Sequence, residues 1–241
     1  MNQAVIPKYQ PLYQQIKEAL LSRVMAGEWP PGTFIPSESS LAEQYSVSVG
    51  TLRKALDALA NDNVVIRYQG KGTAVATHDS DRSLFQFFHL IGLDGSRCLP
   101  ISRVLTRERR AATREEASAL ELEQEEEVVH IRRIRELDNR PALLEDLAVS
   151  ATRFAGLEQE PTPLPNTLYH LYQHRFSHSV AHAEERLFAV AADADDNKYL
   201  GVEIGSPLLE IRRIAKDLKD TPLEYRVSRC ETEHHCYFNK L

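Results

Sequence analysis

The sequence lacks several features that mark broad classes of protein. It has only three cysteines, Cys98, Cys230 and Cys236, and this odd count indicates no disulfide framework. No apolar run approaches the ~18 residues that a membrane-spanning helix requires. The first residues also lack the basic start and apolar stretch of a signal peptide. A cytoplasmic protein without membrane contact is therefore predicted.

Motifs of common enzyme classes are also missing. There is no glycine-rich phosphate loop, no serine nucleophile elbow and no HExxH, so neither a catalytic residue nor a cofactor is predicted. In one extended strand, Cys230, His234 and Cys236 would share a face, as a zinc site could require. A polar terminal strand is the interpretation that we favour, and no metal site is predicted.

Two domains of unequal charge are predicted. The polar segment 77–84 has no periodicity and indicates a linker between a domain at 1–76 and a domain at 85–241. The net charge is −6, yet residues 1–78 hold seven basic and six acidic side chains. The acidic excess therefore lies in the second domain, and most basic residues of the first lie between Arg53 and Lys71.

Three helices and a hairpin are predicted in the first domain. Apolar residues at spacing four indicate a helix from Tyr9 to Met25. Ser37 and Ser48 are good N-caps for a second and a third helix, which a tight link at 46–47 separates. The third helix would bury Leu52, Ala55, Leu56 and Leu59. A hairpin with a glycine-rich turn at 69–72 follows.

This order of elements is typical of a winged helix-turn-helix, in which the amino end of the second motif helix enters the major groove of DNA. Arg53 is the strongest candidate for reading bases, because a guanidinium pairs bidentately with guanine. A scaffold or protein-interaction module is the alternative. The predicted DNA-binding residues are Ser37, Ser39, Ser48, Val49, Gly50, Thr51, Arg53, Lys54, Gly70, Lys71 and Gly72.

The second domain contains an internal duplication. The run from Val128 to Ile134 resembles the run from Leu208 to Ile214, displaced by 80 residues. Each copy reads as a helix, a strand, a tight turn and a strand, and a capping box at Thr113–Glu116 opens the first helix. A strand-like run at 84–91 precedes both copies. We expect the two copies to form one sheet around a pseudo-twofold axis, with clefts near that axis.

Charged residues on these strands form a candidate binding site. Arg133 and Arg135 share a face by alternation. Glu145 lies on the strand after the first turn, and the counterpart region of the second copy holds Glu224. Arginines can fork onto a carboxylate or phosphate, while the glutamates accept from hydroxyls or amines. A surface sheet with cross-strand ion pairs is the alternative, and the pattern alone favours it.

The first domain resembles the DNA-binding domain of the GntR family of bacterial regulators. The resemblance rests on Gly27, Pro31-Gly32, Pro36-Ser37-Glu38, Leu41-Ala42, Val47-Ser48, Thr51–Leu56 and Gly70–Thr73. The family has an arginine that touches DNA where this chain has Ser39, and another where it has Val49. The resemblance implies a dimer that binds double-stranded operator DNA.

The second domain resembles the UTRA domain of HutC-type GntR regulators, with Cys230 replacing a tyrosine of that family. The resemblance implies a chorismate-lyase-like antiparallel sheet, and hence an α+β protein. It implies that a small polar metabolite, as effector, contacts Arg133, Arg135, Glu145, Thr167, Tyr169 and Glu224. The prediction is a homodimeric repressor that its effector releases from DNA. An enzyme of chorismate-lyase type with a fused helix-turn-helix is the alternative.

Overall fold

A computed structural model describes residues 10–62, 64–77, 87–97, 99–123, 126–161 and 163–239. The chain divides into two compact units, residues 1–77 and residues 78–241. Apart from Thr77, the predicted linker at 77–84 lies outside the described residues. Among the helices described, none combines the length and the apolar composition that crossing a bilayer requires.

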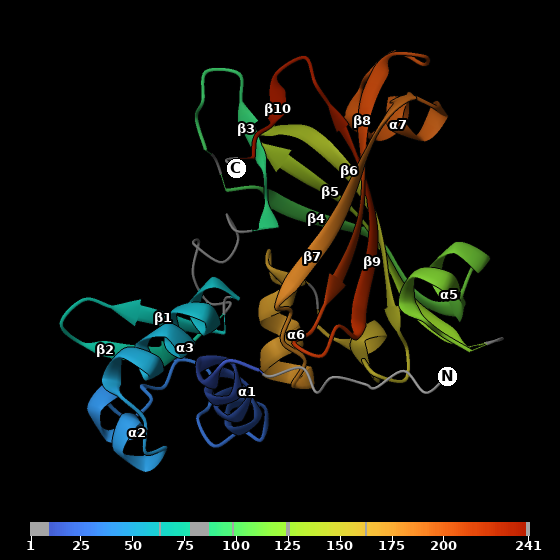
Figure 1. The fold of residues 1–241 in the computed structure, drawn as a ribbon. Coiled ribbons are helices and arrows are strands. Elements are labelled where there is room, and N and C mark those ends of the chain that lie inside the picture. Colours follow the sequence, from blue (N-terminus) through green and yellow to red (C-terminus); the bar gives the residue numbers. More distant parts are fainter. Residues whose placement is uncertain are drawn as a thin grey trace, which may run out of the picture. The chain divides into compact units, whose positions relative to one another are not determined.

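The first unit has the predicted helices and hairpin (Figure 1). Its elements are α1 (Leu12–Met25), α2 (Glu38–Gln44), α3 (Val49–Asn61), β1 (Val65–Tyr68) and β2 (Gly72–Val75). Both predicted N-caps are confirmed, because the hydroxyl of Ser37 accepts from the Ser40 amide and that of Ser48 from the Thr51 amide. The predicted inner face of α3 is also confirmed, since all four of its apolar residues are buried.

The hairpin β1–β2 pairs Val65 with Val75 and Tyr68 with Gly72. Its turn requires glycine, because Gly70 and Gly72 have φ of 73° and 113°, where a Cβ is disfavoured. Phe34 forms a further bridge to Ala74 and so ties the segment before α2 to the hairpin. The base of the hairpin is thereby joined to the helical part of the unit.

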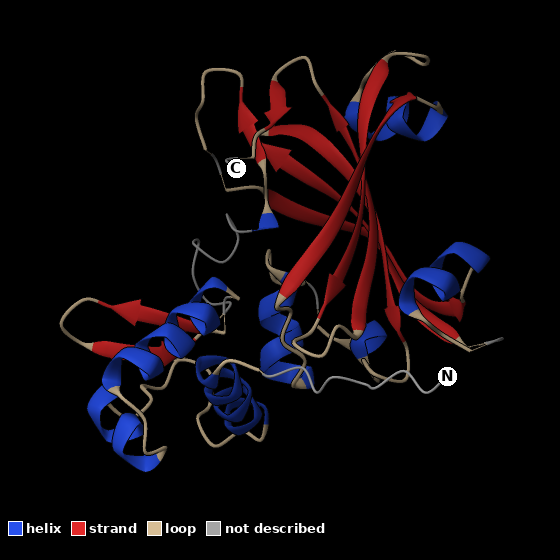
Figure 2. Cartoon of the chain, viewed as in Figure 1, coloured by secondary structure: helices blue, strands red, loops and turns tan. Residues whose placement is uncertain are grey.

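The second unit is built on one six-stranded antiparallel sheet (Figure 2). The first copy of the duplication comprises β4 (Ile101–Ala111), α5 (Arg114–Leu120), β5 (Glu127–Leu137) and β6 (Arg140–Ser150). The second comprises β7 (His182–Ala191), α7 (Ala194–Leu200), β8 (Pro207–Lys216) and β9 (Pro222–Glu231). The strand order is β4-β5-β6-β9-β8-β7, so the three strands of each copy follow one another from an edge to the centre in the same sequence. This symmetry confirms the single sheet and its pseudo-twofold axis. Each copy begins with a strand, β4 or β7, that the sequence did not predict.

The two helices α5 and α7 lie on one face of the sheet, each against a strand of the other copy. Helix α5 packs on β9, and α7 packs on β6. Two ion pairs related by the repeat hold this exchange: Arg212 Nη1 lies 2.8 Å from Glu115 Oε1, and Arg132 Nη2 lies 2.8 Å from Asp195 Oδ2. Capping boxes open both helices, at Thr113–Glu116 as predicted and at Asp193–Asp196.

The opposite face carries the main apolar core. There, α6 (Leu168–Phe176) and the 3-10 helix η1 (Leu157–Gln159) pack on the sheet (Figure 1). Val129 and Ile131 of β5 and Leu147 of β6 are buried against Tyr172 of α6. Further along β5, this same face becomes charged.

A two-stranded sheet of β3 (Leu90–Gly92) and β10 (His235–Tyr237) completes the unit. Two predictions are corrected here. Of the expected strand at 84–91, residues 84–86 lie outside the described residues, and only Leu90 and Ile91 belong to a strand. The expected extended strand from Cys230 to Cys236 is wrong, because β9 ends at Glu231 and the chain turns before β10 begins.

Candidate functional sites

The amino end of α3 forms an exposed, uncharged tip followed by basic residues. Ser48, Val49 and Gly50 are exposed there, Thr51 is half-buried, and Arg53 and Lys54 project from the next turn. The remaining predicted residues lie on neighbouring elements, since Ser37 and Ser39 open α2 and Gly70, Lys71 and Gly72 form the hairpin turn. The hydroxyl of Ser48 lies 2.9 Å from that of Thr51.

Glu38 links this helix to the hairpin. Both Nε and Nη2 of Arg53 donate to Glu38 Oε2, at 3.0 and 2.9 Å. The other oxygen of Glu38 accepts from Arg67 of β1, and Arg67 also contacts Asp57 of α3. One carboxylate therefore contacts both arginines and connects α2, α3 and the hairpin.

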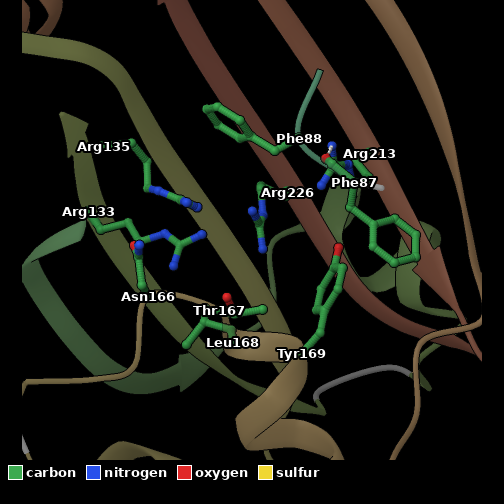
Figure 3. A pocket seen from close by; sticks show the side chains of 10 residues that line it. All are labelled: Phe87, Phe88, Arg133, Arg135, Asn166, Thr167, Leu168, Tyr169, Arg213 and Arg226. Carbon is green, nitrogen blue, oxygen red and sulfur yellow. Dashed lines mark hydrogen bonds between the residues drawn. The ribbon is translucent and has the colours of Figure 1, made fainter. Parts of the chain in front are cut away.

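The second unit contains a cavity between the sheet and the start of α6 (Figure 3). Its empty volume is about 310 Å³, counting the space open to solvent at its mouth. The lining residues are arginines from three strands, two phenylalanines and the start of α6: Phe87, Phe88, Arg133, Arg135, Asn166, Thr167, Leu168, Tyr169, Arg213 and Arg226.

The arginines lie on the face that is apolar further along the strands. Arg133 and Arg135 follow Val129 and Ile131 in the alternation of β5, and each arginine is only 2% exposed. The expectation of a surface sheet with solvated ion pairs is therefore wrong, although the ion pairs themselves are present. Arg133 Nε donates to Glu145 Oε2 at 2.6 Å, across the pair of strands that the register joins at these two residues.

Two buried glutamates hold these arginines without lining the cavity. Glu145 also contacts Arg226 Nη1 at 3.4 Å and Arg135 Nη1 at 3.8 Å. Glu224 is paired with Arg226 Nη2 at 2.7 Å and accepts from the hydroxyl of Tyr172 at 2.8 Å. At the other side, Arg213 Nε donates to Glu185 of β7 at 2.6 Å.

The neighbouring charges shift the pKa values of Glu145 and Arg135 in ways that differ for the two groups. Burial alone would raise the pKa of Glu145, but the charges of Arg133 and Arg226 hold it well below its ordinary value. Burial lowers the pKa of Arg135, and the charge of Arg133 lowers it further. Among the described residues, Nε and Nη2 of Arg135 have no hydrogen-bond partner. Arg135 is thus a buried cation whose environment disfavours its charge.

The structure brings together four of the six predicted effector-binding residues as lining residues: Arg133, Arg135, Thr167 and Tyr169. Glu145 and Glu224 do not line the cavity but form ion pairs with arginines that do. Sequence reasoning missed Arg213 and Arg226. Arg213 is the repeat mate of Arg133, and Arg226 occupies in β9 the place of Glu145 in β6, so the duplication itself carried the signal.

The polar tail contacts itself rather than gathering metal ligands. Glu231 accepts from Nδ1 of His235 at 2.5 Å, and the backbone amides of Glu233 and His234 donate to it as well. Cys230 is buried. Within the part of the chain that the structure describes, no group of three or more His, Cys, Asp or Glu residues is arranged to hold a metal ion.

Comparison with known proteins identifies both units. The family model described as "Bacterial regulatory proteins, gntR family" matches residues 12–75, and the model of the UTRA domain matches residues 98–235. The chain is 30% identical over 211 residues to the histidine utilization repressor of Pseudomonas aeruginosa, covering 84% of this chain and 80% of that protein. It is 29% identical over 215 residues to the "Probable fructoselysine utilization operon transcriptional repressor" of Escherichia coli K12, covering 89% and 88%.

A solved structure agrees. The ligand-binding domain of a GntR-family transcriptional regulator from Bordetella bronchiseptica is 37% identical, with a TM-score of 0.60. The match covers 64% of this chain and 96% of that one. These relatives are named as regulators and not as enzymes, so the alternative of a chorismate-lyase-type enzyme is set aside. The chain belongs to the GntR family of bacterial transcriptional regulators, in the HutC-type group whose second domain is a UTRA domain.

Proposed function

We propose that this regulator is a cytoplasmic, homodimeric repressor that a small polar effector releases from operator DNA. The observation that carries the proposal is the cavity at the start of α6, where the buried Arg135 has two donors without a hydrogen-bond partner among the described residues. The matching domain of the Bordetella bronchiseptica regulator is named as ligand-binding. An unmet buried charge destabilises the empty domain, so it is retained where a ligand completes it. Repressor names among the relatives support the direction of control.

The DNA contacts in this proposal come from the exposed tip of α3 and from the hairpin turn. The amides and hydroxyls of Ser48 and Thr51 suit phosphate oxygens at a helix amino end. Arg53 reads a base edge, and Lys71 contacts a phosphate from the turn. Ser37, Ser39, Val49, Gly50, Lys54, Gly70 and Gly72 complete the surface. In a homodimer, two such helices one DNA turn apart read a palindrome.

The effector contacts in this proposal are Arg133, Arg135, Thr167 and Tyr169, while Glu145 and Glu224 hold the arginines in place. The effector acts only through a difference in its affinity for the DNA-bound and released states. Since the cavity lies between the sheet and α6, closure of α6 onto a ligand is the rearrangement that would distinguish these states.

The test is binding of the full-length protein to DNA from upstream of its own gene, with random DNA as competitor. Arg53→Ala should weaken specific binding by about 1–3 kcal/mol and leave ligand binding unchanged. Arg186→Ala, at an exposed position of β7, is the matched control and should leave both unchanged. The proposal fails if the wild-type protein shows no preference for its upstream DNA.

A further inference from the structure

The first turn of α3 is built from residues that form helices poorly. Val49, Gly50 and Thr51 occupy its first three positions, and β-branched residues and glycine all rank below alanine in helix propensity. The turn also carries no acidic residue, although acidic side chains stabilise a helix amino end and occur in the first turns of α2, α5 and α7. The composition of this turn is therefore not set by the stability of the helix.

Gly50 is not required by the fold of the chain. It lies within α3 and has no positive φ. Among the described residues, a Cβ at this position would meet only the hydroxyl oxygen of Ser48, at 3.8 Å, which is an ordinary contact. An alanine would fit there and would favour the helix. A glycine at an exposed position with open space around it indicates that something outside the chain approaches the backbone closely.

Three polar side chains near this tip have partners within the chain. Ser48 Oγ lies 2.9 Å from Thr51 Oγ1 and accepts from the Thr51 amide at 3.1 Å. Arg53, in the next turn, donates twice to Glu38. Val49 lies beside these pairs with 41% of its surface exposed, and its side chain offers methyl groups alone. An apolar contact is the interaction that Val49 can add to this surface.

The major groove of DNA presents one apolar group that distinguishes a base. Thymine carries a C5-methyl group there, whereas adenine, guanine and cytosine present donors and acceptors. The amino end of the second helix of a helix-turn-helix lies against these base edges. A valine at the first position of that helix gains by contact with a thymine methyl group. Against another base it would leave donors or acceptors unmet.

From these observations we infer that Val49 is a specificity-determining residue that reads the C5-methyl group of a thymine in the operator. This rests on the proposed function, because it names the base that the proposed DNA-binding helix recognises. The contact is close because Gly50 lets the backbone of α3 approach the groove. Discrimination at this position comes from burial of a methyl group and not from charge, so it does not depend on salt.

The experiment measures binding of the full-length protein to two versions of the DNA upstream of its own gene. One version contains thymine, and in the other every thymine is replaced by uracil, which lacks the C5-methyl group and pairs with adenine in the same way. Random DNA of each kind is the reference, and affinities are measured at about 50 and 200 mM salt. Val49→Ser removes both methyl groups of the side chain, and Met25→Ser is the matched control at a position of α1 that is 40% exposed.

Discrimination between upstream and random DNA should fall about fourfold on uracil-containing DNA for each methyl group that is read, and roughly fifteenfold where both half-sites of a palindrome carry one. This loss should be equal at both salt concentrations, should shrink to less than about twofold in Val49→Ser, and should persist in Met25→Ser.

Equal discrimination on both versions, a loss that disappears at the higher salt concentration, or an unchanged loss in Val49→Ser would overturn the inference. Its failure is distinguishable from that of the proposed function. A protein that prefers its upstream DNA equally with either base retains the proposed function and refutes only the reading by Val49, whereas a protein without that preference refutes both.

Discussion

Arg133 and Arg135 lie two residues apart on the same face of β5, yet their replacement by methionine should change stability in opposite directions. Within the described part of the chain, two buried donors of Arg135 lack partners, and each costs about 1–3 kcal/mol. Against this stands its attraction to Glu145 at 3.8 Å, about 4 kcal/mol at an effective dielectric of ~20, which the like charges of Arg133 and Arg226 oppose. Because those like charges offset much of the attraction, removing Arg135 together with its two unmet donors should stabilise the unit by about 2 kcal/mol.

Arg133 differs because it makes the shortest contact to Glu145, at 2.6 Å. Arg133→Met leaves that carboxylate buried without its main partner, which destabilises by about 3–5 kcal/mol. The assay is thermal unfolding of the ligand-free, full-length protein at pH 7.5, following the transition of the second unit. For a unit of this size, each kcal/mol corresponds to roughly 2–4 °C, so Arg135→Met should raise its Tm by roughly 4–8 °C.

The direction of the Tm change in Arg135→Met tests this reasoning. A Tm that falls in Arg135→Met as far as in Arg133→Met would show that both arginines stabilise the empty domain. The view of Arg135 as a strained, ligand-directed group would then be refuted. A gain in stability accompanied by loss of ligand response is the trade-off expected where a site is kept for binding at the expense of folding.

Three further outcomes are expected. Glu38→Gln should raise affinity for random DNA, because it removes a negative charge, yet reduce discrimination for the operator about fivefold, because Arg53 loses its ion pair with Glu38. Unchanged discrimination would contradict this. The pKa of Glu145 lies below its ordinary value of 4.5, so its contribution to stability is complete above pH 4.5 and is lost as the pH falls toward the lower pKa of the folded state. Tm should therefore be level from about pH 8 to 6 and decline below about pH 4.5. A level Tm down to about pH 3 would argue against the ion pairs of Glu145. Since the hydroxyl of Tyr225 donates to Glu115 at 2.6 Å, unfolding measurements on Glu115→Gln, Tyr225→Phe and the double variant should give a coupling of about 1 kcal/mol, whereas strict additivity would deny the contact between the two copies.

The sequence predicted the first unit almost completely because its signals are local. N-caps such as Ser37 and Ser48 and the buried stripe of α3 depend on residues only three or four positions apart. The edge strands β4 and β7 escaped prediction for a physical reason. Edge strands carry charges on exposed positions, and most of β7 is exposed, so alternation of polar and apolar residues is weak there.

The sequence predicted part of the candidate effector site, and the part that it missed depended on which residues are buried. Alternation placed Arg133 and Arg135 on one face but did not reveal that this face is buried, because arginines favour the surface in general. Phe87 and Asn166 reach the cavity from segments whose positions depend on tertiary packing. Arg213 was accessible from the repeat, since a duplicated site has a mate for each of its residues.

The exchange of α5 and α7 between the copies has a consequence for how such a domain arose and how it can be divided. The inner strand of each half, β6 or β9, is covered mainly by the helix of the other half, and α5 makes only a smaller contact with β6 of its own half. A single half expressed alone would leave that apolar surface bare and should associate with a second identical half. The present chain is then equivalent to a pair of small subunits fused end to end, and two separately produced halves should reassemble when mixed.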